Sequence, residues 1–202
     1  MSVLNDDVEA AKNAAFLLLT SPGVPFLYYG EEIGMLGKKP DEDIRRPLQW
    51  SGEDDAGFTS GLPWRPPSSD YTTKNIAAQS EDPDSLLSLY RRLIQLRNEH
   101  AALRVGDHYF VETGHPAVYA SLRVSQEETI LILINLGSES VGDYALNLEV
   151  GPLSGEYIPA PLLDNGQFTS PTVTEPGGFV NYQPVPEIPP YGRFILQLQP
   201  KD

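Results

Sequence analysis

The chain has 202 residues, of which 40% are hydrophobic and 21% charged, as in folded globular proteins rather than disordered ones. Its 28 acidic and 14 basic side chains give a formal net charge of −14, which argues against partners such as nucleic acid or an anionic membrane surface. The absence of cysteine excludes disulfides, thiolate metal sites and cysteine nucleophiles. No apolar run is long enough to cross a bilayer, and no signal peptide is recognised, so the localisation is left open.

Two elements are predicted at the start of the chain. Apolar side chains recur at helical spacing from Val8 to Leu18, and Asn5 is placed to cap this helix. We expect the helix to be buried and to end within residues 20–23. The apolar run at residues 24–29 then predicts a short strand, of the kind that is covered on both faces in a parallel sheet.

A long polar stretch follows, from about residue 36 to residue 81. It is rich in glycine and proline and contains both tryptophans of the chain, Trp50 and Trp64. Loops of this length are uncommon in compact domains unless they are functional. The pair Asp82-Pro83 favours the start of a second helix, and a leucine stripe predicts that this helix runs to about His100.

The rest of the chain changes to a period of two. Alternating or continuous apolar residues predict strands at four places: 118–124, 129–136, 144–150 and 194–198. Strands at this spacing, with no helix among them, indicate an antiparallel sandwich. The predicted fold class is therefore α+β. A first domain at residues 1–104 is followed by an antiparallel all-β sandwich domain at residues 105–202.

The residues taken alone do not form a complete set of catalytic groups. Glu31 and Glu32 are adjacent, so in an extended segment they point to opposite faces and cannot easily flank one bond. The acidic groups at residues 41–43 and 53–55 are typical of a solvated loop. The three histidines lack metal-ligand spacing, and no nucleophile elbow or phosphate-binding loop occurs. We therefore predict no catalytic residue and no metal ligand in this chain.

Aromatic and arginine side chains gather in the long loop, directly after the predicted strand. They are Arg45, Arg46, Trp50, Phe58, Trp64 and Tyr71. In a barrel enzyme, the loop at the carboxyl end of a strand is where active sites are built. Aromatic faces stack on sugar rings, and an arginine fork holds hydroxyls or orients a carboxylate. The alternative is that the two tryptophans only pin a long loop to the barrel.

Several motifs of the N-terminal half occur together in one known family. The run at residues 21–35, SPGVPFLYYGEEIGM, closely resembles the eighth barrel strand of the α-amylase family. Residues 39–50 are similar to its Arg-x-Pro-Met-Gln-Trp segment, with Leu48 in place of the usual methionine. The resemblance continues through residues 56–59 and 63–64 and through residues 85–100, which resemble the family's last barrel helix.

This resemblance implies a retaining hydrolase of α-linked glucans. In such enzymes one carboxylate attacks the anomeric carbon and another protonates the leaving oxygen. A third acid assists in this family, and it sits in an Asn-His-Asp motif that is absent here. In relatives this motif precedes the strand-eight segment by one helix. The resemblance thus implies a truncated C-terminal portion that is inactive alone, in which residues 1–104 hold the last strand and helices of a (β/α)8 barrel.

One substrate-binding residue follows from the resemblance. Arg45 matches the family arginine that contacts the sugar at the bottom of the pocket in exo-acting α-glucosidases. Glu32 matches the strand-eight glutamate, which we interpret as structural. Calcium is common in the family, but its usual ligands lie outside this segment, so no cofactor is predicted here. The expected partner of the parent enzyme is an α-glucan or maltooligosaccharide.

A second hypothesis is an independent carbohydrate-binding or structural module formed by the β-rich part. It predicts exposed aromatic side chains in a row on one sheet face, such as Tyr119, Tyr144 and Tyr157. The alternative is that these tyrosines pack against the barrel or against the opposite sheet. A further expectation concerns the apolar faces at residues 24–29 and 86–94, which lack barrel partners. We expect them to be covered by the β-domain, by a rearranged loop or by self-association with a second copy of the chain.

Overall fold

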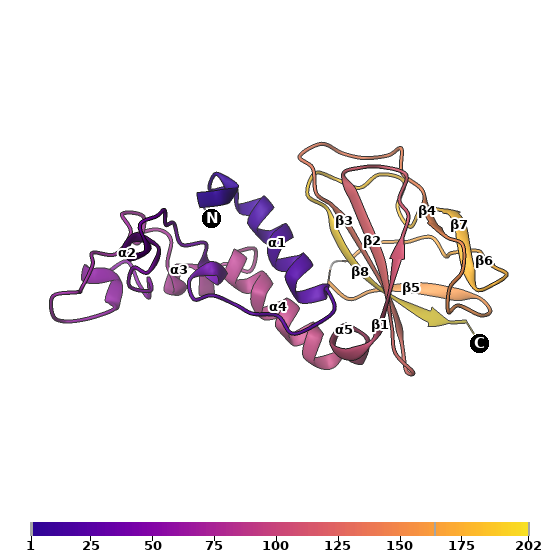
Figure 1. Cartoon of the computed structure of the whole chain (residues 1–202), viewed down its shortest axis with the longest axis horizontal. Coiled ribbons are helices and arrows are strands. Elements are labelled where there is room, and N and C mark those ends of the chain that lie inside the picture. Colours follow the sequence, from indigo (N-terminus) through magenta and orange to yellow (C-terminus); the bar gives the residue numbers. More distant parts are fainter. Residues whose placement is uncertain (1, 164, 202) are drawn as a thin grey trace. The chain divides into compact units, whose positions relative to one another are not determined.

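The computed structural model describes residues 2–163 and 165–201, which form two compact units (Figure 1). Unit 1 comprises Met1–Ala15 and Pro25–Arg92, and unit 2 comprises Phe16–Val24 and Leu93–Asp202. The domain boundary between residues 104 and 105 stays a prediction. Within the described ranges, no helix has both the length and the apolar character needed to span a membrane.

Unit 1 consists of short helices joined by loops. Its elements are η1 (Ser2–Leu4), the first part of α1 (Val8–Thr20), η2 (Glu31–Ile33), α2 (Asp41–Ile44), η3 (Asp54–Gly57), α3 (Ile76–Ser80) and the first part of α4 (Leu86–Glu99). The predicted first helix is confirmed, but its cap is Asp7 rather than Asn5. The Asp7 carboxylate accepts hydrogen bonds from the backbone amides of Glu9 and Ala10, at 2.9 and 3.0 Å.

Buried amide side chains hold the long loop of unit 1 in place. Gln49 is fully buried, and its Nε2 donates to the Lys74 carbonyl at 2.5 Å and to Asp70 Oδ1 at 3.3 Å. Gln79 Nε2 donates to the Ile33 carbonyl at 2.9 Å. Hydrogen bonds of this kind satisfy buried backbone groups, so the loop is ordered although it contains little regular structure.

The strand predicted at residues 24–29 does not form, and this prediction is wrong. A strand needs neighbours to accept and donate its backbone hydrogen bonds, and no strand of the described residues pairs with this segment. Phe26 is consequently 85% exposed, and Val24, Leu27, Tyr28 and Tyr29 are exposed as well. The covering predicted for residues 24–29 is thus not supplied by the described residues, whereas Leu86 and Leu93 of α4 are buried as expected.

Unit 2 contains a five-stranded antiparallel sheet with the strand order β1-β2-β3-β8-β5. Its strands are β1 (Asp107–Val111), β2 (Val118–Val124), β3 (Thr129–Asn135), β8 (Arg193–Pro200) and β5 (Tyr157–Pro161). β3 pairs along its length with β2 on one side and β8 on the other, with Leu131 opposite both Leu122 and Leu196. The prediction of a central strand at residues 129–136 is therefore confirmed.

A three-stranded antiparallel sheet shares the core of unit 2. It has the order β4-β7-β6, formed by β4 (Leu146–Leu148), β7 (Gly178–Tyr182) and β6 (Val173–Thr174). Leu122, Leu133 and Leu196 of the large sheet belong to one buried cluster with Leu146 and Phe179 of the small sheet. The predicted α+β class with antiparallel strands is confirmed.

The opposite face of the large sheet is also buried. Ile130, Ile132 and Ile134 of β3 and Ile195 of β8 are almost completely inaccessible to solvent. The short helix α5 (Ala101–Val105) contacts β2 and β3, which places helical segments of unit 2 against the sheet (Figure 1). Residues 130–134 of β3 are therefore all apolar, because both faces of the strand are covered.

Arg97 of α4 is buried and holds the chain that follows α1. Its guanidinium donates to three backbone carbonyls, those of Leu19, Ser21 and Gly23, at 2.7, 3.1 and 2.5 Å. Burial, together with the positive charge of Arg104, lowers the pKa of Arg97. The planar fork of arginine suits several acceptors at once, so this one side chain ties down the end of α1.

Arg123 of β2 binds the same segment from the sheet. Its Nη1 donates to the Thr20 carbonyl at 3.0 Å, and its Nη2 donates to the Gly106 carbonyl at 2.9 Å. Burial and then the charge of Arg97 lower its pKa. Residues 16–24 thus belong to unit 2 through polar contacts that the sequence pattern did not indicate.

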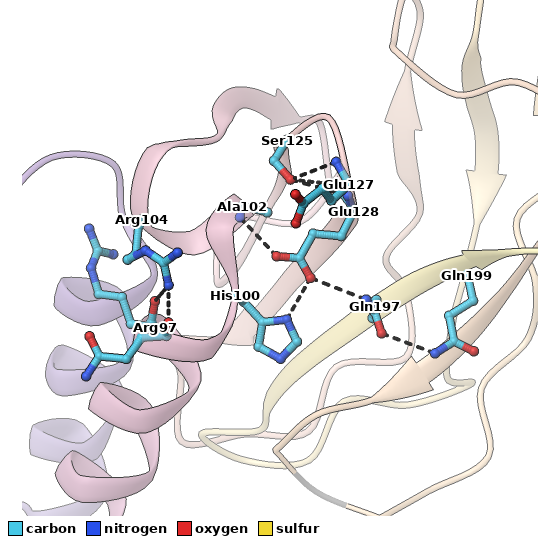
Figure 2. Close-up of polar contacts among 10 residues, drawn as sticks. Arg97, His100, Ala102, Arg104, Ser125, Glu127, Glu128, Gln197 and Gln199 are labelled. Atoms are coloured by element: carbon cyan, nitrogen blue, oxygen red, sulfur yellow. Dashed lines mark hydrogen bonds and ion pairs between the residues drawn. The ribbon is translucent and has the colours of Figure 1, made fainter.

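Glu128, in the turn between β2 and β3, joins three elements of unit 2 (Figure 2). Its Oε1 accepts the Ala102 amide at 3.0 Å, at the first turn of α5. Its Oε2 lies 2.6 Å from His100 Nδ1 and accepts Gln197 Nε2 of β8 at 3.3 Å. The carboxylate therefore caps the N-terminus of α5, and its negative charge stabilises the positive end of the helix dipole.

Candidate functional site

Arg45 directly follows α2 in unit 1. Its guanidinium Nη2 lies 3.2 Å from Asp41 Oδ2, and the side chains of the two residues are 59% and 50% exposed. An ion pair exposed to this extent contributes little to stability. The Arg45 guanidinium is therefore weakly held and accessible to a ligand.

The guanidinium of the adjacent Arg46 is engaged in contacts within the loop. Its Nη2 lies 2.8 Å from Asp43 Oδ1, and its Nη1 donates to the Pro66 and Pro67 carbonyls at 2.9 and 3.3 Å. Asp43 also accepts from Arg65 Nε at 3.1 Å. This network closes the loop onto itself, so Arg46 is a structural support.

One aromatic side chain, Tyr29, interacts electrostatically with Arg45. The rings of Tyr28 and Tyr29 are 4.9 Å apart, and the Tyr29 hydroxyl donates to the Arg46 carbonyl at 3.1 Å. Burial and the neighbouring Tyr28 raise the pKa of Tyr29, while the charge of Arg45 opposes this rise. Trp50 and Trp64 are 49% and 61% exposed, and their pinning of the loop to a barrel stays a hypothesis.

Several carboxylates of unit 1 make contacts that stabilise the fold. Asp41 and Asp43 are each paired with arginine, and Glu31 Oε2 accepts the Tyr28 amide at 3.3 Å. Burial, together with the carboxylates of Glu31 and Glu32, raises the pKa of Tyr90 to about 12. Across the described parts of the chain, no group of three or more histidine, aspartate or glutamate side chains is arranged to hold a metal ion.

The row of exposed tyrosines predicted for the β-rich part is wrong. Tyr144 is buried, and its hydroxyl donates to the Val185 carbonyl at 2.5 Å. Tyr157 packs against the core of unit 2. Tyr119 lies on the outer face of β2, where its hydroxyl is 3.1 Å from His108 Nε2. The exposed apolar side chains of this unit include Phe110, Val150 and Val180, which sequence periodicity did not single out.

A family model described as the α-amylase catalytic domain matches residues 1–106. The chain belongs to the α-amylase family of glycoside hydrolases. The match covers just over half of the sequence and contains Arg45, Arg46 and both tryptophans.

Curated α-amylase-family proteins are similar over much of the chain. The oligo-1,6-glucosidase of Parageobacillus thermoglucosidasius is 29% identical over 170 residues, which cover 66% of this chain and 30% of that protein. The trehalose synthase/amylase of Mycobacterium tuberculosis is 31% identical over 203 residues, which cover 93% of this chain and 30% of that protein. The chain thus spans about 30% of the length of these relatives.

Solved structures of the family share the fold. The trehalulose synthase of Pseudomonas mesoacidophila is 25% identical, with a TM-score of 0.71, and the alignment covers 95% of this chain and 38% of that one. A trehalose-6-phosphate hydrolase of Bacillus licheniformis has a TM-score of 0.69 at 24% identity, which shows similarity of fold alone.

Proposed function

We propose that these residues form the strand-eight side and the C-terminal β-domain of a retaining glycosidase that acts on α-linked glucans. On this proposal residues 1–104 belong to the last strand and helices of a (β/α)8 barrel, and residues 105–202 form a β-sandwich. The family match and the names of the relatives support the substrate class. The two antiparallel sheets around one core support the sandwich.

Arg45 carries the proposed contact with substrate. Its exposed guanidinium interacts electrostatically with Tyr29, whereas Arg46 is fully engaged with Asp43 and two carbonyls. An arginine fork donates hydrogen bonds to sugar hydroxyls, and an aromatic ring packs on the apolar face of a pyranose. The contrast between two adjacent arginines is the observation that favours Arg45.

The catalytic acids are not part of the proposal for this chain. A retaining glycosidase needs two carboxyl groups about 5–5.5 Å apart, one ionised and one protonated. Asp41 is paired with Arg45, and Asp43 is paired with Arg46 and Arg65. No cofactor is assigned to these residues. We therefore propose that this chain alone does not hydrolyse glucans.

The relatives support an α-glucosidic substrate. They include an oligo-1,6-glucosidase, a trehalose synthase/amylase and a trehalose-6-phosphate hydrolase. A structure of a double mutant of the trehalulose synthase MutB contains isomaltulose. The exposed segment at residues 24–29 further supports self-association, because a second copy would cover its apolar side chains.

Two assays test this proposal. The 202-residue chain is incubated at high concentration with soluble starch and maltotetraose, and reducing ends are measured; hydrolysis that co-purified with the chain would overturn the proposal. Binding of maltotetraose is then followed by NMR. Arg45→Ala is expected to abolish the shifts around Arg45, whereas Arg91→Ala, a change at another exposed arginine, leaves them intact. Equal binding by both variants would remove Arg45 from the site.

A further inference from the structure

A groove of ≈ 630 Å³ lies in unit 2, beside the small sheet and the edge strand β1. Its lining comes from four strands and the turns between them: Phe110, Glu112, Asn147, Glu149, Val150, Thr174, Glu175, Pro176 and Val180, with Leu148 below. The volume falls within the range of about 300–1,000 Å³ that is usual for small-molecule sites. All of these residues belong to unit 2, and none is part of the loop that carries Arg45.

Apolar side chains in the groove face solvent although the core of unit 2 is complete. Phe110, Val150 and Val180 are 60%, 62% and 56% exposed. The Phe110 ring lies 6.2 Å from that of Tyr119, a partner that helps to hold it. Exposed apolar groups that gather in a depression are more typical of a binding surface than of a monomer's ordinary surface.

The backbone of the groove is rigid. Glu112 and Asn147 exchange two backbone hydrogen bonds of 3.0 and 2.8 Å, which join β1 to β4. The Asn147 side chain is used internally, since its Nδ2 donates to the Ala145 carbonyl and its Oδ1 accepts the Asn181 amide. Gly178 lets β7 approach β4 closely, because a Cβ there would overlap the Leu148 carbonyl. The lining is thus preorganised for a ligand.

Carboxylates surround these apolar side chains. Glu112, Glu149 and Glu175 line the groove, and none of the ion pairs between described residues involves them. They do not converge on a common metal position within the described residues. A free carboxylate accepts hydrogen bonds from hydroxyl groups, and it can accept from two neighbouring hydroxyls at once.

We propose that this groove binds a neutral α-glucan chain at a site separate from Arg45. A pyranose presents an apolar C–H face, which would pack on Phe110, Val150 and Val180, and a rim of hydroxyls, which would donate to the glutamates. The net charge of −14 and the local glutamates disfavour an anionic ligand. The choice of an α-linked glucan rests on the proposed function. The site would hold substrate near the enzyme without taking part in the reaction.

The test is an NMR titration of the full chain with maltoheptaose at millimolar concentration. The backbone amides of Glu112, Val150 and Val180 are expected to shift. Phe110→Ala should weaken binding roughly tenfold through loss of the ring, and Phe110→Trp should retain it. Val105→Ala, which truncates another exposed side chain of unit 2, is the matched control and should bind as the parent chain does.

A second variant removes the acceptors and keeps the shape. Glu112→Gln combined with Glu149→Gln is expected to weaken binding while unfolding as the parent chain does, because both side chains are exposed. Binding that is equal in the Phe110→Ala chain and the parent would overturn the inference. Equal affinity for a β-linked glucan, or shifts produced by calcium or a basic peptide but not by maltoheptaose, would overturn it as well.

The two proposals fail separately. Arg45→Ala is expected to leave the shifts in the groove unchanged. If ligand shifts the NMR signals of the groove and Arg45→Ala changes no shift anywhere, Arg45 is removed from the proposed function. The groove then stays assigned as a glucan-binding site. Shifts confined to the surroundings of Arg45 would overturn the groove and leave the proposed function standing.

Discussion

Unit 2 has an extensive apolar core between its two sheets, whereas unit 1 buries few large apolar side chains. Leu133 of β3 is completely buried, while Leu62 of unit 1 is completely exposed. Order in unit 2 comes from two sheets and a shared core. Order in unit 1 comes mainly from polar contacts such as those of Gln49, Arg46 and Asp43.

The two apolar runs of the chain show why the units differ. Residues 129–135 form a strand because β2 and β8 pair with both of its edges and both faces are covered. Residues 26–29 are similarly apolar, but no strand among the described residues pairs with them, and they stay irregular and exposed. Apolar composition permits a buried strand, but partners supply the backbone hydrogen bonds that make one.

The largest effect is expected from truncating the core of unit 2. Leu133→Ala should lower the free energy of unfolding by about 2–5 kcal/mol, because it leaves a cavity between the sheets. Leu62→Ala, the same change at a fully exposed leucine, should alter it by less than about 0.5 kcal/mol.

The same pair of variants tests the separation of the units. Trp50 and Trp64 are the only tryptophans and both lie in unit 1, so their fluorescence reports that unit, whereas far-UV circular dichroism reports the β-sheets. In urea, Leu133→Ala should shift the dichroism transition more than the fluorescence transition. Equal shifts in both signals would contradict the division into two units.

The buried arginine of α4 is expected to have the next largest effect. Arg97→Leu leaves the carbonyls of Leu19, Ser21 and Gly23 without their donor, and should cost unit 2 about 2–4 kcal/mol. Arg97→Lys keeps the charge but not the fork, and should have an intermediate effect. Arg91→Leu, at an exposed arginine of the same helix, is the control for loss of a cation. A melting temperature of Arg97→Leu equal to that of Arg91→Leu would show that these hydrogen bonds contribute nothing.

Local patterns predicted the longest elements, α1, α4, β2, β3 and β8, but they missed β1, β5, β6 and β7 and the short helices α2, α3 and α5. β2 spans the predicted residues 118–124, and α1 and α4 lie where helical spacing indicated. The pattern at 118–124 was interpreted as half-buried, yet Ser121 and Arg123 on its second face are buried too. Helical segments cover that face, and the strand's own sequence carries no signal of a distant partner.

The candidate sites were harder to predict, for the same reason. Arg45 was found only through its resemblance to a family motif, since an arginine in a polar loop is not distinctive. The groove was not predicted at all. Phe110, Val150 and Val180 are far apart in sequence, and the strand order brings them to one surface. Burial of Tyr144 likewise depends on a carbonyl 41 residues away.

A smaller effect is expected at the carboxylate that caps α5. Glu128→Gln should reduce the stability of unit 2 by about 1–2 kcal/mol, because the charge-assisted bond to the Ala102 amide and the contact with His100 are weakened. Glu127→Gln, at the exposed neighbour, is the matched control and should be nearly neutral. Thermal unfolding followed by dichroism checks this. A larger loss in Glu127→Gln than in Glu128→Gln would refute the capping role.

The smallest effect concerns a buried phenol and depends on pH. Burial raises the pKa of Tyr144 to about 12, although the Val185 amide, which donates to the phenol oxygen at 3.4 Å, opposes the rise. Since the folded pKa lies above the ordinary value of 10.0, this contribution to stability is complete below pH 10 and is lost as pH rises through about 12. Unit 2 should therefore lose stability in that alkaline window, as neutral phenols must ionise.

Tyr144→Phe separates this titration from the hydrogen bond. At neutral pH the variant should be less stable by about 1 kcal/mol, because the Val185 carbonyl loses its donor. Its stability should then fall less steeply above pH 10, with Tyr182 remaining as a second phenol whose pKa burial raises. Urea unfolding at neutral pH and at about pH 11 provides the measurement. Parallel losses in the two chains would mean that alkaline sensitivity arises outside this core, and that unit 2 does not exclude solvent from Tyr144 as its burial implies.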